Sequence, residues 1–219
     1  LLFTGRPLVL DWETENVDAI LNVWFGGSEA ASAITDVVFG RKSPCGKLTA
    51  TFPRSVGQVP IYYNHLQTSH PDPQDGVFNR YCSNYIDMSN KPLYPFGYGL
   101  SYTSFRYGVP SLSSDIMLPG QVLTLTVDVT NTGSRDGTEI VQLYIRDRYA
   151  DIARPLKELK GFERVSIGKG ETRKVTFTVT EEDLKYYNTD LQYKADSGEF
   201  EIMVGPNSEE LQTLKFQLK

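Results

Sequence analysis

The chain has 219 residues, of which 40% are hydrophobic and 22% charged, an ordinary composition for one large globular domain or two small ones. The formal net charge of −5 argues against nucleic acid or an anionic membrane as a partner, and no segment approaches the ~20 apolar residues of a membrane span. The first ten residues show neither an initiator methionine nor a signal-peptide layout, so we expect the sequence to start inside a longer protein.

Cysteine and histidine usage indicates neither a disulfide framework nor a metal site. Cys45 and Cys82 could pair, but two cysteines do not define a framework. There is no CxxC motif, and neither His65 nor His70 has a second histidine or a cysteine at ligand spacing. We therefore predict no metal and no cofactor.

Residues 1–60 show the pattern of an α/β domain. The apolar run Pro7–Leu10 is typical of a buried parallel strand, and Val23–Phe25 predicts the next strand. Between them, residues 17–21 have apolar positions at helical spacing. The order strand, helix, strand, helix indicates an α/β arrangement.

A second helix is predicted over residues 29–38. Gly26-Gly27 ends the preceding strand, Ser28 offers an N-cap hydroxyl and Gly40 suits the position just after the helix. Glycines before a helix also occur in phosphate-binding loops, but no such motif is present and Glu29 would repel a phosphate. We therefore interpret this segment as a tight turn.

Residues 61–106 form a long aromatic-rich loop and hinge. Its last part, Leu93–Thr103, contains three tyrosines, a phenylalanine, a proline and two glycines, which favours rigid packing at a domain boundary over a flexible linker; an ordinary core loop is the alternative. Earlier in the segment, tyrosines lie among Asn and Asp, a composition typical of a sugar-facing surface or of a loop that packs on a neighbouring domain. For the sugar-facing interpretation, Arg80 and Tyr81 are the candidate substrate-binding residues.

Residues 107–219 change to a period of two, which predicts an all-β domain. Alternating segments lie at 122–130, 140–145, 174–179, 199–204 and 214–218, and turn residues separate them. Six or seven such strands predict a fibronectin type III-like or immunoglobulin-like sandwich, with a short helical turn within 181–187. The predicted inward side chains are Leu123, Leu125, Val127, Val129, Val141, Leu143, Ile145, Phe177, Val179, Phe200, Ile202 and Val204.

Several motifs together resemble glycoside hydrolase family 3, with the greatest likeness to its periplasmic β-glucosidases. In chain order they are Trp24-Phe-Gly-Gly-Ser-Glu-Ala30, Gly46-Lys-Leu48, Thr51-Phe-Pro-Arg-Ser-Val-Gly-Gln-Val-Pro60, Tyr94-Pro-Phe-Gly-Tyr-Gly-Leu-Ser-Tyr-Thr103, Val129-Thr-Asn-Thr-Gly133, Val141-Gln-Leu-Tyr144 and Arg154-Pro-Leu-Lys-Glu-Leu-Lys-Gly-Phe162. Two positions depart from the family: Cys45 replaces the usual Ser, and Asn84 replaces an Arg found in many members.

The resemblance implies a (β/α)8 barrel, then an α/β sandwich domain, then a fibronectin type III-like domain. This chain would supply only the end of the second (1–60) and the whole of the third (107–219). The family's chemistry is retaining glycoside hydrolysis by two carboxyl groups, both expected upstream of this chain. The resemblance therefore implies no catalytic residue here; Glu29 matches a structural motif and not the acid/base.

The expected partners follow from the same resemblance. They are the missing barrel and α/β domain and an oligosaccharide or β-glucoside substrate, in a periplasmic or secreted protein. An incomplete α/β sheet would expose an apolar edge, which also predicts association beyond a monomer or disorder near the N-terminus. The alternative function is a stand-alone β-sandwich binding or adhesion module, which would not require the α/β segment.

Overall fold

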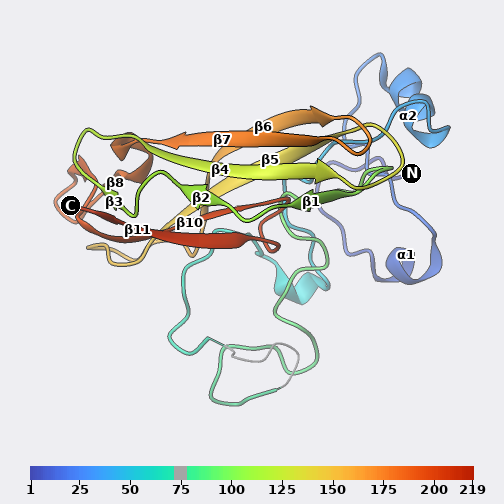
Figure 1. Cartoon of the computed structure of the whole chain (residues 1–219). Coiled ribbons are helices and arrows are strands. Elements are labelled where there is room, and N and C mark those ends of the chain that lie inside the picture. The colour runs from blue at the N-terminus through green and yellow to red at the C-terminus, as the bar shows by residue number, and fades with distance from the viewer. Residues whose placement is uncertain (72–77) are drawn as a thin grey trace. The chain divides into compact units, whose positions relative to one another are not determined.

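The computed structural model describes residues 1–71 and 78–219, and the chain divides into two compact units (Figure 1). The N-terminal unit comprises Leu1–Tyr63 and Thr68–Tyr102. The sandwich unit comprises Asn64–Gln67 and Thr103–Lys219. No helix in the described part of the chain is long and apolar enough to cross a membrane.

The N-terminal unit contains little regular structure. Its helices are α1 (Asp11–Asn16), α2 (Ala30–Val38) and the 3-10 turn η1 (Val56–Gln58). The strands predicted at residues 7–10 and 23–25 are wrong, because parallel strands need continuous pairing and only a single parallel bridge, Leu2 to Asn22, forms here. The helical turn predicted at 17–21 is also wrong: the first helix, α1, ends at Asn16, and acidic Asp11 and Glu13 in its first turn complement the helix dipole.

Helix α2 lies where it was predicted, but the residue that caps its N-terminus differs from the prediction. Gly40 follows the helix with a φ of 69°, a left-handed conformation that glycine adopts without strain. The cap is Glu29 and not Ser28, and no side chain caps the helix there. Gly26 is required for space, since a Cβ on it would lie 2.4 Å from the Cβ of Ala30.

Phe52 forms the centre of the N-terminal unit. It is 1% exposed, and its ring contacts those of Trp24 and Tyr94 edge-on at centroid distances of 5.9 and 6.4 Å. The amide of Phe52 donates to the carbonyl of Tyr94 at 2.9 Å. The hinge therefore packs along the segment around Phe52.

The hinge aromatics pack on other rings but remain partly exposed. Phe96 stacks on Tyr63 with centroids 4.3 Å apart, and Tyr94 stacks on Tyr98 at 5.2 Å, but these side chains are only partly buried. Tyr102 is 43% exposed, and its hydroxyl donates to the carbonyl of Val37 at 2.7 Å. Tyr102 therefore contacts the rest of its unit through this hydrogen bond more than through a buried ring.

The sandwich unit is built from strands that run roughly alongside one another, coloured green to red in Figure 1. Their bounds are β1 Phe105–Tyr107, β2 Ser111–Leu112, β3 Ile116–Met117, β4 Leu123–Asn131, β5 Gly137–Asp147, β6 Glu158–Ile167, β7 Thr172–Val179, β8 Tyr186–Tyr187, β9 Tyr193–Lys194, β10 Gly198–Gly205 and β11 Gln212–Leu218. The short helical turn predicted before β8 is the 3-10 turn η2, Glu181–Leu184.

Two sheets enclose the core of this unit. In one sheet, β4 pairs with β7 on one side and with β1 and then β2 on the other; the second sheet has the order β3-β11-β10-β5-β6. All pairings are antiparallel except that of β3 with β11. Each of the twelve predicted inward side chains is buried in one common cluster, which confirms the predicted sandwich core.

Residues 64–67 belong to the sandwich unit although they precede it in sequence. Leu66 forms an antiparallel bridge with Pro155, and the amide of Leu156 donates to the carbonyl of His65 at 3.0 Å. Arg146 of β5 donates to the side-chain oxygen of Gln67 at 2.8 Å. These hydrogen bonds hold the backbone just before Thr68, where the rest of the long loop begins.

Candidate functional site

Arg80 and Tyr81, the candidate substrate-binding residues, contact each other on the surface of the loop. An Nη of Arg80 donates to the Tyr81 hydroxyl at 2.8 Å, and the guanidinium carbon lies 4.9 Å from the centre of the tyrosine ring. Tyr81 is 70% exposed. This pair presents a flat aromatic surface beside a fixed cation, a combination that can stack on an apolar ring face and donate to a hydroxyl.

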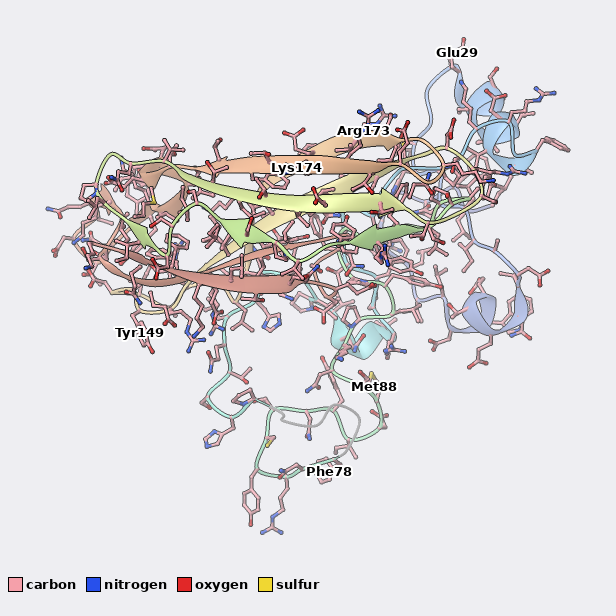
Figure 2. All side chains as sticks on the ribbon, viewed as in Figure 1. Glu29, Phe78, Met88, Tyr149, Arg173 and Lys174 are labelled. Carbon is pink, nitrogen blue, oxygen red and sulfur yellow. The ribbon has the colours of Figure 1, made fainter. Side chains whose placement is uncertain are left out.

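The backbone around this pair is held by a short turn. The side-chain oxygen of Asn79 accepts from the amide of Tyr81 at 3.0 Å, and the Asn79 carbonyl accepts from the amide of Cys82 at 3.0 Å. The amide of Ser83 then donates to the carbonyl of His70 at 2.8 Å. Figure 2 shows Phe78 projecting outward just before the turn, and its side chain is 54% exposed.

The other chemically reactive side chains of the N-terminal unit are not brought together. Glu29 points outward from the turn before α2 (Figure 2) and is exposed. Cys45 and Cys82 form no disulfide with each other. Within residues 1–71 and 78–219, no three His, Cys, Asp or Glu side chains form a group suited to a metal ion.

Among the described residues, Asp147 at the end of β5 is an acid with a raised pKa that sequence reasoning missed. Burial raises its pKa above the ordinary value, against the opposing effects of the Tyr149 amide and Arg154. One carboxylate oxygen accepts from that amide at 3.1 Å, and the other has no hydrogen-bond partner among the described residues.

The surroundings of Asp147 indicate a structural role. An Nη of Arg154 donates to Glu158 at 2.6 Å, and its guanidinium carbon lies 4.7 Å from the ring centre of Tyr186. The Tyr186 hydroxyl donates to Asp196. These contacts hold the segment after β5 against the β8–β9 hairpin. We therefore interpret the motif that begins at Arg154 as structural and not catalytic.

The raised pKa of Asp147 predicts a pH-dependent cost in stability. Because the folded state binds this proton more tightly than the unfolded state, stability falls as the pH rises from 3.8 through the raised folded-state pKa. We expect Asp147→Asn to raise the melting temperature at neutral pH and to have little effect below pH 3.8, measured by calorimetry. Asp128→Asn, at an exposed position, controls for the loss of one charge; an Asp147→Asn variant that melts lower at neutral pH would contradict the prediction.

Comparison with known proteins places both units. Residues 1–102 match the glycosyl hydrolase family 3 C-terminal domain, and residues 139–208 match the fibronectin type III-like domain. The chain belongs to glycoside hydrolase family 3. It carries the family's C-terminal domain and the fibronectin type III-like domain, as the resemblance of its motifs implied.

The similar proteins are glycosidases of greater length. The chain is 46% identical to a periplasmic β-glucosidase of Salmonella typhimurium, over 100% of its own length and 28% of that protein. It is 41% identical to a β-xylosidase of Formosa agariphila, over 100% of its length and 30% of the relative. The crystal structure of a Listeria innocua β-glucosidase in complex with isofagomine superposes with a TM-score of 0.93 at 40% identity, covering 99% of this chain and 30% of that one.

The chain spans about 30% of the length of these relatives, and it corresponds to their C-terminal portion. The chain thus matches the C-terminal part of family 3 proteins.

Proposed function

We propose that the chain is the C-terminal part of a retaining β-glucosidase whose two catalytic carboxyl groups lie outside residues 1–219. The observation that carries this proposal is the 46% identity to a β-glucosidase over the entire chain. The substrate is a β-glucoside or short β-linked oligosaccharide. The protein is periplasmic or secreted, in keeping with the name of the Salmonella relative.

The partner of the N-terminal unit is the remainder of the same enzyme. Large apolar side chains of this unit are exposed, namely Leu1 (63%), Phe3 (69%), Trp12 (66%), Phe25 (88%) and Phe39 (76%). Exposed apolar surface of this kind favours burial against another domain or a second copy. We infer that the missing barrel and α/β domain cover it, and that the protein without them self-associates, which light scattering tests; a clean monomer would contradict this inference.

Within that enzyme, Arg80 and Tyr81 contact the outer part of the sugar. The support is the exposed, mutually hydrogen-bonded pair described above. A stand-alone binding module is the alternative function, but the match of residues 1–102 to a family 3 domain favours the hydrolase.

The test is the full-length gene product assayed with a β-linked glucose disaccharide. We expect hydrolysis, and we expect Tyr81→Ala to raise KM several-fold with little change in kcat, because loss of ground-state and transition-state binding in equal measure affects KM alone. Phe162→Ala, which removes an exposed aromatic on β6 (63% exposed), is the matched control. Unchanged KM in Tyr81→Ala would exclude the loop from the site, and no hydrolysis by the full-length protein would refute the proposed activity.

A further inference from the structure

Two tyrosines face solvent side by side on the β8–β9 hairpin. Tyr187 and Tyr193 are directly paired across the two strands, with ring centroids 5.0 Å apart and an angle of 39° between the planes. Tyr187 is 63% exposed and Tyr193 47%. Single exposed aromatics are common on protein surfaces, whereas these two rings are in contact with each other.

The hairpin is anchored by residues other than this pair. Tyr186 is 3% exposed; its hydroxyl donates to Asp196 and accepts from the amide of Asp151 at 3.0 Å. The turn is closed by buried Asn188, whose side-chain oxygen accepts from the amide of Gln192 at 2.8 Å. Because side chains alternate along a strand, Tyr186 points inward and Tyr187 outward.

Charged groups lie beside the aromatic pair. Lys185 donates to Glu182 at 2.8 Å, and its Nζ lies 5.9 Å from the ring centre of Tyr193. Desolvation and the neighbouring Glu182 carboxylate raise the pKa of the Tyr193 phenol. The surface therefore combines aromatic area with a hydroxyl, an ammonium and a carboxylate.

We propose that Tyr187 and Tyr193 form a binding site for a β-linked glucan chain, separate from the site of hydrolysis. A pyranose ring has an apolar C–H face that can stack on a tyrosine, and hydroxyls that can bond to Glu182, Lys185 and the phenols. The choice of sugar class rests on the proposed function; the position of the site rests on the hairpin alone. Binding at this site would hold the enzyme on an oligomeric substrate.

The competing explanation is that the pair only stabilises the hairpin, as cross-strand aromatic pairs do. The two explanations differ in what Tyr187→Leu should change. Leucine retains an apolar cross-strand contact but lacks the flat ring, whereas Tyr187→Phe retains the ring and loses the hydroxyl. If sugar binding requires the aromatic ring, Tyr187→Phe should bind and Tyr187→Leu should not. If the pair only stabilises the hairpin, the two variants should not differ in sugar binding.

The experiment titrates the 219-residue chain with cellohexaose, followed by calorimetry. We expect binding by the unmodified chain, binding by Tyr187→Phe within a few-fold of it, and about tenfold or greater weakening in Tyr187→Leu, with the melting temperature of all three alike. Phe162→Leu, at an equally exposed aromatic on another strand (63%), should bind normally.

Three results would overturn the proposal: no binding of cellohexaose, equal binding by Tyr187→Leu, or equal loss in Phe162→Leu. Failure here is distinguishable from failure of the proposed hydrolase, because this titration needs no catalytic carboxyl group and the disaccharide assay does not depend on the hairpin.

Discussion

Replacing Asn131 by alanine should lower the free energy of unfolding of the sandwich unit by about 3–5 kcal/mol, since two carbonyls and two donors lose the same buried partner at once. The side chain is fully buried. Its Nδ2 donates to the carbonyls of Arg135 at 2.8 Å and Ile167 at 3.0 Å. Its Oδ1 accepts from the hydroxyl of Thr103 at 2.6 Å and from the amide of Gly133 at 3.1 Å.

Urea unfolding followed by far-ultraviolet circular dichroism measures this loss. Asn131→Asp is the isosteric comparison: it keeps Oδ1 but places an oxygen against the two carbonyls, so it should be destabilised as well, which separates hydrogen bonding from volume. Thr132→Ala, at the exposed neighbouring position, should unfold like the unmodified chain. A midpoint for Asn131→Ala close to that of Thr132→Ala would show the network to be unimportant.

The same network explains the sequence motif from Val129 to Gly133. Val129 is in the core, Asn131 fastens the turn, and Gly133 leaves room for it. A Cβ on Gly133 would lie 2.2 Å from the hydroxyl of Thr103 and 2.7 Å from the amide of Ser104. The motif thus reflects packing where β4 ends.

The sandwich core could be predicted from sequence because burial there alternates. Along β4 the inward residues from Leu123 to Val129 are buried and every second residue is more exposed, which is the pattern of a strand with one face in the core. β6 shows no such alternation: most of its residues are partly buried or exposed, and only Ile167 is buried. The sequence prediction therefore omitted β6, although it pairs along most of β5.

Residues 1–60 were harder to predict because local apolar runs do not decide pairing. The run Pro7–Leu10 resembles a strand, yet a strand also needs a neighbour with free backbone groups. Phe52, by contrast, is buried by partners distant in sequence, Trp24 and Tyr94. Such contacts have no signature in the spacing of nearby residues.

The candidate sites could also be predicted from the sequence only in part. Composition indicated the loop that holds Arg80 and Tyr81, but not that the two side chains bond to each other. Asp147 gave no signal, because its raised pKa comes from burial in the folded chain. Tyr187 and Tyr193 lay in a region without alternation, and only the hairpin pairing brings their rings together.

The isolated chain should release no nitrophenol from nitrophenyl β-glucoside above the buffer rate. Retaining hydrolysis needs two carboxyl groups about 5–5.5 Å apart across the glycosidic bond, one as nucleophile and one as acid/base. Neither group is expected within residues 1–219. Glu29 is exposed on a turn, where nothing described in the structure would orient it toward a bond or shield it from water.

The assay compares the purified chain with its Glu29→Gln variant and with the full-length gene product. Fluorescence of Trp24, which packs against Phe52, and circular dichroism of the sandwich establish that both units are folded, so that inactivity is not mistaken for unfolding. We expect the chain and Glu29→Gln to give equal background rates and the full-length protein to turn over. Turnover by the folded chain that Glu29→Gln abolishes would make Glu29 catalytic and would place the chemistry inside this chain, because a single carboxylate substitution removes acid/base or nucleophilic action without removing the fold.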